Sequence, residues 1–239
     1  MKSIEDLKIK IFADGADLNS INKLSSMDLV SGFTTNPSLM RKAGVEDYEK
    51  FSKNVLSIIG NRSLSLEVFA DDFSEMKNQA RAIASWGKNV AVKIPVMTTK
   101  GEFTGPVIEA LSKEGITLNV TAIMTVEQVE KVILVSDDKS HLICSVFAGR
   151  IADTGRDPVL HMEKCLRLTR SRDNSELLWA SPREVYNIFQ ANEIGCEIIT
   201  VGHDILKKID LFGKDLNEYS KETVQTFFTD AKNSGFTIK

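Results

Sequence analysis

Short apolar segments alternate with longer segments of helical periodicity along most of the chain. The apolar segments are rich in Val, Ile, Leu and Phe, as expected of strands that are buried on both faces of a parallel sheet. They predict eight strands, over residues 8–13, 32–35, 64–69, 90–96, 117–123, 141–148, 176–180 and 197–201. Apolar residues recurring at helical spacing between them predict helices that include 73–86, 102–113, 126–135, 158–169, 183–191 and 204–209.

The spacing of the strands indicates how the sheet is closed. From Asp14 to Gly202 the ends of the eight strands cover 202 − 14 = 188 residues in seven intervals, about 27 residues for each strand–helix unit. An open doubly wound sheet is the main alternative, but it usually has a glycine-rich first turn, and the sequence contains neither GxGxxG nor GxxxxGK[ST]. We therefore expect an α/β fold, a single (β/α)8 TIM barrel domain over residues 1–239.

Three local patterns refine the helix predictions. Asp157-Pro158 predicts a capped helix start with proline in the first turn, and residues 181–184 (SPRE) form a capping-box pattern. Residues 215–231 predict an additional C-terminal helix after the eighth unit. That helix either covers the barrel or packs on a neighbouring subunit.

Composition and charge exclude several classes of protein. The chain has 239 residues, of which 42% are hydrophobic and 26% charged, as in ordinary globular proteins. Its formal net charge of −3 opposes nonspecific binding to nucleic acid. No segment approaches the roughly 20 apolar residues that cross a bilayer, and the charged residues 1–6 do not resemble a signal peptide. We expect a cytoplasmic protein with no nucleic-acid or membrane partner.

The cysteines and histidines predict neither disulfides nor a metal site. Cysteine occurs three times, far apart and without a CxxC pair, which is typical of a reducing compartment, and histidine three times without metal-ligand spacing. We therefore expect buried apolar cysteines, no bound metal and no cofactor. These residues are Cys144, Cys165, Cys196, His141, His161 and His203.

Charged and polar residues interrupt several of the apolar strands near their C-terminal ends, where barrel enzymes place their active sites. Lys93 lies at the centre of the apolar run 90–96, Glu67 lies late in 64–69, and Asp14 follows the first strand. The fifth and sixth strands each offer two residues on one face, since alternate residues of a strand share a face. These are Asn119 and Thr121, and Ser145 and Phe147.

A lysine among apolar neighbours is either a nucleophile or half of an ion pair. Burial favours the neutral amine of Lys93, which can attack a carbonyl to form a Schiff base and thereby assist cleavage of a neighbouring C–C bond. That chemistry needs an acid/base such as Glu67 or Asp14. The alternative is a structural Lys93–Glu67 ion pair between two strands. The residues alone leave both interpretations open.

Two arginines follow consecutive strands. Arg150 follows the sixth strand and Arg183 follows the seventh. Adjacent barrel loops that carry arginines beside a helix N-terminus are typical of a phosphate site. The pair therefore predicts an anionic group, such as a phosphate, on the substrate.

Five segments, in order along the chain, resemble the signature motifs of the transaldolases, in the group that includes short members similar to fructose-6-phosphate aldolase. The resemblance extends from Asp14 to about Gly202. The matching segments are residues 32–39 (GFTTNPSL), 92–95 (VKIP), 119–121 (NVT), 145–151 (SVFAGRI) and 180–183 (ASPR).

The resemblance implies a role for each matching residue. Lys93 would form the Schiff base with a ketose phosphate, Asp14 would take the proton of the C4 hydroxyl, and Glu67 would act as acid/base through a water held by Thr121. Phe147 would line the pocket. The hydroxyls of the dihydroxyacetone unit would be bound by Asn36 and Asn119 with Thr35 and Ser145 beside them, and the phosphate by Arg150, Ser181 and Arg183.

The same resemblance favours one reaction without fixing it. True transaldolases have a glutamate on the third strand, whereas fructose-6-phosphate aldolases have a glutamine there and a tyrosine on the sixth; this chain has Glu67 and Phe147. Transfer of a dihydroxyacetone unit is therefore expected, with free aldol cleavage, or transfer on a non-standard sugar, as the alternative. A catalytically silent sugar-phosphate-binding barrel is a further alternative. Short family members form rings tied by C-terminal helices, so we expect a homo-oligomer.

Overall fold

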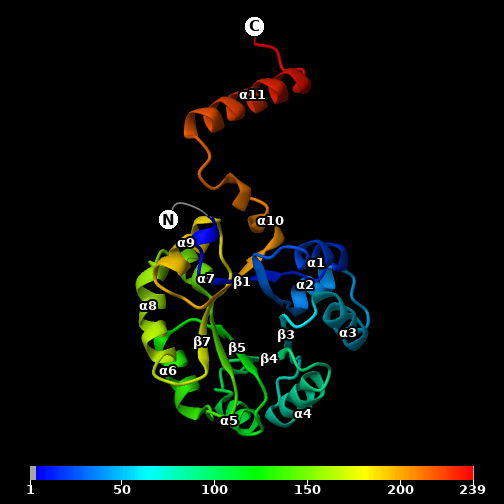
Figure 1. Ribbon diagram of the computed structural model, residues 1–239, viewed down its shortest axis with the longest axis vertical. Coiled ribbons are helices and arrows are strands. Elements are labelled where there is room, and N and C mark those ends of the chain that lie inside the picture. The colour runs from blue at the N-terminus through cyan, green and yellow to red at the C-terminus, as the bar shows by residue number, and fades with distance from the viewer. Residues whose placement is uncertain (1–3, 239) are drawn as a thin grey trace.

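The fold is a closed parallel barrel, and the computed structural model describes it over residues 4–238. Residues 1–3, which begin the charged N-terminal segment, and Lys239 lie outside the described residues. Within residues 4–238 eight parallel strands pair in sequence order, and β8 returns to β1 (Figure 1). The strands are β1 (Lys10–Asp14), β2 (Val30–Thr34), β3 (Ser63–Glu67), β4 (Val90–Pro95), β5 (Leu118–Ile123), β6 (Leu142–Val146), β7 (Ser175–Trp179) and β8 (Ile198–Gly202). The expected (β/α)8 fold is confirmed.

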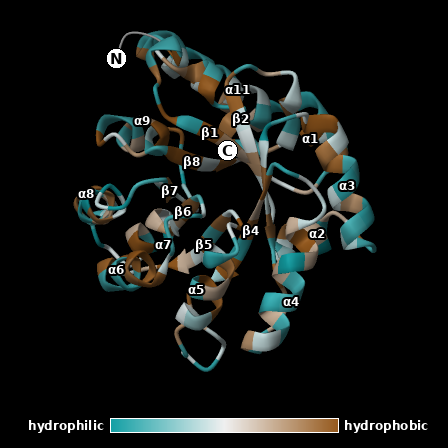
Figure 2. Cartoon of the chain, turned by 60° about the horizontal axis from the view of Figure 1, so that its bottom comes forward, coloured by the Kyte–Doolittle hydropathy of each residue, from teal (hydrophilic) through white to brown (hydrophobic). Residues whose placement is uncertain are grey.

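Helices surround the strands, and their apolar faces pack on the outside of the barrel (Figure 2). They are α1 (Leu18–Ser25), α2 (Pro37–Lys42), α3 (Tyr48–Ile59), α4 (Phe73–Ala84), α5 (Gly105–Lys113), α6 (Val126–Val135), α7 (Ala148–Asp153), α8 (Pro158–Thr169), α9 (Tyr186–Glu193) and α10 (His203–Leu206), with short 3-10 turns at Ile4–Asp6 and Ile209–Leu211. A last helix, α11 (Leu216–Ser234), lies outside this ring. Within the described chain, no helix is both long enough and apolar enough to cross a membrane.

One predicted helix start is confirmed and one is wrong. Asp157 caps α8 by accepting a hydrogen bond from the backbone N–H of Val159. The capping box at residues 181–184 does not form, because α9 begins only at Tyr186. The preceding turn is stabilised instead by the side chain of Asn187, which accepts hydrogen bonds from the backbone N–H groups of Arg183 and Glu184.

The barrel interior is filled by an apolar layer below the C-terminal strand ends. This layer contains Phe12, Ala91, Ile143, Leu178 and Ile198, all buried. A Cβ at position 32 would lie 2.6 Å from the Phe12 ring, so Gly32 leaves the space that this ring occupies. The layer fills the barrel below the polar residues, which lie at the C-terminal ends of the strands.

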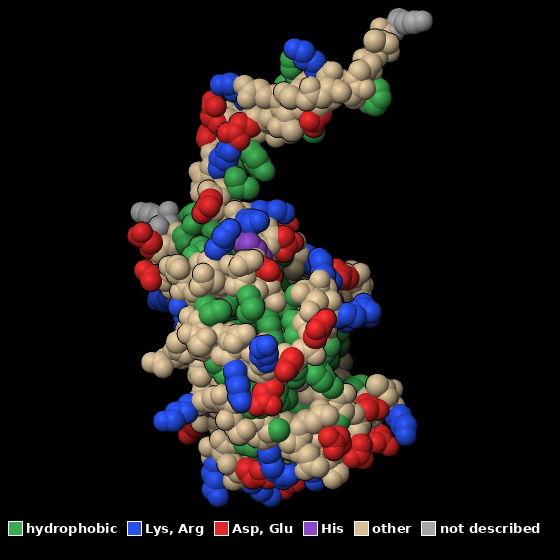
Figure 3. Space-filling model, turned by 90° about the vertical axis from the view of Figure 1, so that its right-hand side faces the viewer, with side chains coloured by type: hydrophobic (Ala, Val, Ile, Leu, Met, Phe, Trp, Pro, Cys, Tyr) green, Lys and Arg blue, Asp and Glu red, His purple; other side chains and the backbone are tan. Residues whose placement is uncertain are grey.

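The C-terminal helix α11 projects away from the barrel (Figures 1 and 3). It confirms the helix expected over 215–231 and ends three residues later, and Asp215 caps its first turn. None of its residues is buried, and its apolar side chains Leu216, Val224, Phe227 and Phe228 are 63–79% exposed. Of the two expected placements, the helix therefore does not cover the barrel of its own chain.

Candidate active site

A cavity of about 520 Å³ lies at the C-terminal ends of the strands and gathers most of the residues that the sequence analysis selected. Ten of the twelve line it, from seven of the eight strands or the loops that follow them. Their convergence follows from the barrel, since the C-terminal ends of parallel strands meet at one rim. They are Asp14, Asn36, Glu67, Lys93, Asn119, Thr121, Ser145, Phe147, Arg150 and Ser181.

The charged centre of the cavity is the contact between Lys93 and Glu67. Their Cα positions are paired in register on β4 and β3, and Nζ of Lys93 lies 2.9 Å from Oε2 of Glu67. Nζ also donates a hydrogen bond of 2.9 Å to the carbonyl oxygen of Thr35. Lys93 is only 7% exposed. The amine is therefore held at one point of the cavity floor beside a carboxylate that can exchange a proton with it.

Asp14 lies at the end of β1 and faces the same cavity. Burial raises the pKa of this carboxyl group, and the negative charge of Glu67 acts in the same direction. The positive charge of Lys93 and a 2.7 Å hydrogen bond from the Thr34 hydroxyl oppose that increase. A carboxyl group with a raised pKa exchanges protons more readily near neutral pH than an ordinary aspartate does.

A second set of hydrogen bonds fixes polar side chains on β3, β5 and β6. Ser145 donates to Oδ1 of Asn119 over 2.6 Å, and Asn119 donates through Nδ2 to Oγ of Ser65 over 3.0 Å. All three residues are buried. Asn36 also lines the cavity and caps α2 by accepting from the backbone N–H of Leu39. These amide and hydroxyl groups can bind the hydroxyl groups of a sugar without reorganising.

The backbone beside Thr121 is irregular. Thr121 is buried and lines the cavity, and the pairing of β5 with β6 shifts register between Val120 and Ile123. The following residue, Ala122, has a φ of +61°, which is unfavourable for alanine. This bulge turns the end of β5 at the cavity rim, the kind of place where strain is retained for function.

Two of the three residues expected to bind phosphate line this cavity. The guanidinium of Arg150 lies 5.1 Å from the centre of the Phe147 ring, and none of the ion pairs among residues 4–238 involves it. Ser181 also lines this cavity and has a φ of +60°. The third residue, Arg183, lines an adjoining cavity of about 950 Å³ and forms an ion pair with Asp153. The expected cluster is therefore divided between two cavities.

Thr35 is placed differently from the expectation. Its side chain does not line the cavity, and its hydroxyl group is buried with no hydrogen-bond partner among residues 4–238. Its carbonyl oxygen holds Lys93 instead. Because alternate residues of a strand face opposite sides, the cavity receives Thr34, which the sequence analysis did not select. Thr200 of β8 also lines the cavity and was not selected; neutral threonines are common in strands and gave no signal.

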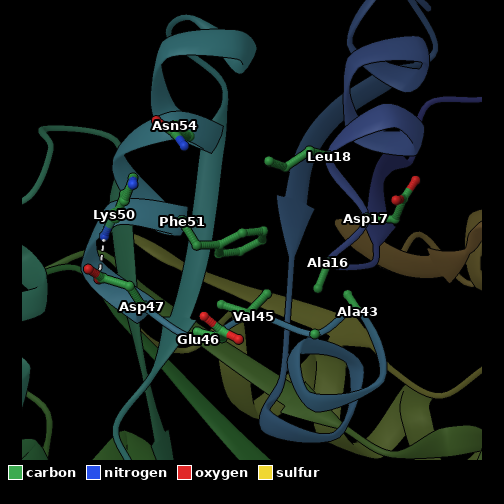
Figure 4. A pocket seen from close by; sticks show the side chains of 11 residues that line it. Ala16, Asp17, Leu18, Ala43, Val45, Glu46, Asp47, Lys50, Phe51 and Asn54 are labelled. Carbon is green, nitrogen blue, oxygen red and sulfur yellow. Dashed lines mark hydrogen bonds between the residues drawn. The ribbon is translucent and has the colours of Figure 1, made fainter.

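The cysteines, the possible metal ligands and a second cavity take no part in the active site described above. Burial raises the pKa of the Cys144, Cys165 and Cys196 thiols to about 12, so these thiols are packing groups, as expected. Across residues 4–238, no three His, Cys, Asp or Glu side chains gather in a way that could hold a metal ion. A separate cavity of about 390 Å³ between α1 and α3 is lined by Asp47, Lys50 and Phe51, among others, and by none of the residues that line the active-site cavity (Figure 4).

Comparison with known proteins identifies relatives along nearly the whole chain. The family model described as transaldolase/fructose-6-phosphate aldolase matches residues 11–238. A probable transaldolase of Methanococcus maripaludis is 34% identical over 215 residues, which cover 90% of this chain and 94% of the relative. A probable transaldolase of Dehalococcoides mccartyi is 32% identical over 202 residues, covering 84% and 90%.

Solved structures share the fold at low identity. The 3-hexulose-6-phosphate synthase of Salmonella typhimurium superimposes with a TM-score of 0.59 at 12% identity, covering 83% of this chain and 91% of that chain. The dihydrodipicolinate synthase of Rhodopseudomonas palustris has a TM-score of 0.55 at 14% identity, covering 95% and 82%. At such identities the likeness shows the barrel fold alone.

Proposed function

Because the chain belongs to the transaldolase/fructose-6-phosphate aldolase family, we propose that it transfers a dihydroxyacetone unit from a ketose phosphate, such as fructose 6-phosphate, to an aldose phosphate. The observation that carries this proposal is the buried Lys93 amine, 2.9 Å from the Glu67 carboxylate and in one cavity with Asp14. These groups supply the nucleophile and two acid/base residues that a Schiff-base mechanism needs.

The first step would form the Schiff base. Glu67 takes a proton from the Lys93 ammonium group, and the neutral amine attacks C2 of the ketose to give a carbinolamine. Loss of the C2 hydroxyl as water, with a proton returned from Glu67, leaves an iminium ion. The Thr121 hydroxyl would hold the water that carries these protons, beside the Glu67 carboxylate.

The second step would break the C3–C4 bond. The Asp14 carboxylate removes the proton of the C4 hydroxyl, C4 becomes the carbonyl carbon of an aldehyde, and the electron pair of the broken bond enters the iminium system as an enamine. After the aldehyde leaves, C3 of the enamine attacks the aldehyde carbon of the acceptor, and Asp14 returns its proton to the new hydroxyl. Hydrolysis through Glu67 then releases the product ketose and the free lysine.

The polar residues around this centre support a sugar phosphate as the substrate. Asn36, Asn119 and Ser145 would bind the hydroxyls of the dihydroxyacetone unit, while Phe147 forms the wall beside Arg150. Arg150 and Ser181 would hold the phosphate, with Arg183 in the adjoining cavity. The proposed mechanism needs no metal and no cofactor.

Product analysis separates transfer from free aldol cleavage. With fructose 6-phosphate and an acceptor such as erythrose 4-phosphate, we expect a seven-carbon ketose phosphate and glyceraldehyde 3-phosphate, and little turnover without the acceptor. Release of free dihydroxyacetone at the same rate without an acceptor would instead favour an aldolase. Lys93→Met should lose turnover while its circular dichroism spectrum stays unchanged, and retained turnover would contradict the Schiff base.

A homo-oligomer formed through α11 belongs to the same proposal. The exposed apolar side chains of α11 include Phe227 (68%) and Phe228 (72%), and a monomer rarely leaves such a group of side chains in water. Light scattering on the full-length chain should show an oligomer, and Phe227→Ser/Phe228→Ser should reduce its mass to that of a monomer. A monomeric wild-type chain would contradict the proposal. We place the enzyme in the cytoplasm.

A further inference from the structure

Strand β8 brings a buried hydroxyl group to the floor of the active site. The hydroxyl groups of Thr200 on β8 and Thr34 on β2 are hydrogen-bonded to each other, and Thr34 also donates to Oδ1 of Asp14 over 2.7 Å. Thr34 is 3% exposed and Thr200 is 8% exposed. Because β1 pairs with both β2 and β8, the three side chains form a chain of hydrogen bonds around the end of β1.

The direction of this hydrogen-bond chain follows from counting protons. An ionised carboxylate only accepts hydrogen bonds, so Thr34 donates its single hydroxyl proton to Asp14. In its contact with Thr200, Thr34 must therefore accept, and Thr200 must donate. Residues 4–238 offer the Thr200 hydroxyl no other hydrogen-bond partner, so its proton stays directed at the Thr34 oxygen.

Hydrogen bonds in such a chain strengthen one another. A hydroxyl group that accepts a hydrogen bond is polarised and becomes a better donor. The hydrogen bond that Thr200 donates also occupies a lone pair of the Thr34 hydroxyl oxygen. It thereby fixes the direction in which the Thr34 proton points. Loss of Thr200 would leave Thr34 as a weaker and less directed donor to the Asp14 carboxylate.

Asp14 lies among charges of both signs. Inside the barrel it faces Lys93 of β4, which favours the carboxylate, and Glu67 of β3, which opposes it. The adjoining cavity, which Asp14 also lines, has further charged or titratable groups on α2 and α10, beside α10, and in the loops that follow β1 and β7. They are Asp17, Lys42, Arg183, His203, Asp204 and Lys207.

We propose that Thr200 is a positioning residue of the active site, whose hydroxyl group acts through Thr34 to hold the Asp14 carboxylate ionised and correctly oriented. The inference rests on the proposed function, because the proposed function makes Asp14 the base that removes the proton of the C4 hydroxyl. It gives β8 a part in the chemistry, although Thr200 is not expected to touch the reacting atoms. The proton balance is simple, because the threonine hydroxyls keep their protons throughout.

The most direct test is a titration of Asp14 in the free protein, which needs no turnover. The carboxyl carbon of Asp14 would be followed by NMR in protein with 13C-labelled aspartate, and its signal assigned by its absence in Asp14→Asn. Thr34→Val should raise the pKa of Asp14, so that the carboxyl binds a proton roughly tenfold more tightly. Thr200→Val should raise it in the same direction, by roughly two- to threefold in proton affinity.

Two matched variants separate positioning from simple packing. Thr200→Ser keeps the hydroxyl group and should titrate as the wild type does, whereas Thr200→Val keeps the shape. In the double variant Thr34→Val/Thr200→Val, the second substitution should add nothing to the first, because Thr200 acts only through Thr34. Thr200→Ser and Thr200→Val should both keep the circular dichroism spectrum of the wild type.

The kinetic counterpart is the pH dependence of kcat/KM. The acidic limb should move to higher pH in Thr200→Val and stay in place in Thr200→Ser. An unchanged Asp14 titration in Thr200→Val, a serine variant that behaves like valine, or additive effects in the double variant would each overturn the inference. Failure of the proposed function would appear separately, as no borohydride-trapped adduct on Lys93 in the wild-type chain.

Discussion

The backbone of Gly149 packs directly against the carbonyl group of Ser181. A Cβ added at position 149 would lie 1.6 Å from that oxygen, and the N–H of Gly149 donates to the carbonyl oxygen of Ala180 over 3.3 Å. This contact joins the start of α7 to the loop after β7. It therefore sets the spacing between Arg150 and Ser181, the two residues proposed to bind the substrate phosphate inside the cavity.

Gly149→Ala should separate these two loops. Because a backbone oxygen cannot yield as a flexible side chain would, we expect a loss of about 2–3 kcal/mol in the free energy of unfolding. KM for fructose 6-phosphate should rise roughly tenfold, as about 1.4 kcal/mol of phosphate binding is lost. Urea unfolding and steady-state kinetics measure both. Gly15→Ala, where an added Cβ meets no atom within 4 Å, is the stability control.

The two arginines should contribute unequally to phosphate binding. Arg150 lines the main cavity, whereas Arg183 forms an ion pair with Asp153 and lines the adjoining one. Arg150→Ala should therefore raise KM for phosphorylated sugars by about 10- to 100-fold, and Arg183→Ala by less than that. Neither should raise KM for unphosphorylated dihydroxyacetone. A larger effect at Arg183 would mean that the Asp153 ion pair opens when substrate binds.

The raised pKa of Asp14 predicts an acidic limb in the pH profile and a cost in stability. Burial raises this pKa, so kcat/KM should fall as the pH is lowered through a value above that of an ordinary aspartate. The folded state also holds the proton more tightly than the unfolded state does. Stability therefore decreases as the pH rises from the ordinary pKa through the raised one.

Asp14→Asn tests the second half of this prediction. At neutral pH the variant should be inactive and more stable than the wild type, by roughly 1 kcal/mol or about 2–4 °C in Tm. The gain should disappear at a pH below the ordinary pKa of aspartate, where both states are protonated. A variant less stable than the wild type at pH 7 would show that the carboxylate stabilises the fold.

The opposite end of the barrel should affect stability without affecting catalysis. Glu176 at the start of β7 accepts hydrogen bonds from Lys10 over 2.5 Å and from His141 over 2.9 Å. Burial is the largest single influence and opposes ionisation, but the two hydrogen bonds and the positive charges of Lys10 and His141 together lower the pKa of Glu176. Its contribution is therefore present above the ordinary pKa of glutamate and is lost as the pH falls through the lowered value.

Glu176→Gln should accordingly lower the free energy of unfolding by about 1 kcal/mol at pH 7 and by less at pH 3. Its kcat/KM should stay within about twofold of the wild type, because catalytic residues lie at the other end of the strands. Thermal unfolding at the two pH values, with kinetics at pH 7, gives the comparison. A tenfold loss of kcat/KM would contradict this separation.

Charges within apolar runs were the signal that could be read from the sequence. Lys93 and Glu67 stand out because an unpaired charge inside a buried strand is costly, so the two were expected to be functional or paired, and they are 2.9 Å apart. The eight strands were equally visible, since strands covered on both faces are continuously apolar. These two signals located the barrel and the centre of the site.

Neutral residues and contacts between distant loops gave no such signal. Thr34 lines the cavity and the neighbouring Thr35, which the sequence analysis selected, does not, because one residue along a strand reverses the face on which a side chain lies. The hydrogen bond of Thr200 with Thr34 joins residues far apart in the sequence, and so does the ion pair of Arg183 with Asp153. Such contacts depend on how the closed barrel brings β8 beside β1 and α7 beside the β7 loop.

The central claim is that Lys93 forms a Schiff base with a ketose phosphate. The measurement is borohydride reduction of the wild-type chain with fructose 6-phosphate, followed by intact-protein and peptide mass spectrometry, with Lys93→Met as the control. We expect a dihydroxyacetone-sized adduct on the peptide that contains Lys93 and none in the control. An adduct on another lysine, or no adduct with this or any other ketose phosphate, would contradict the account.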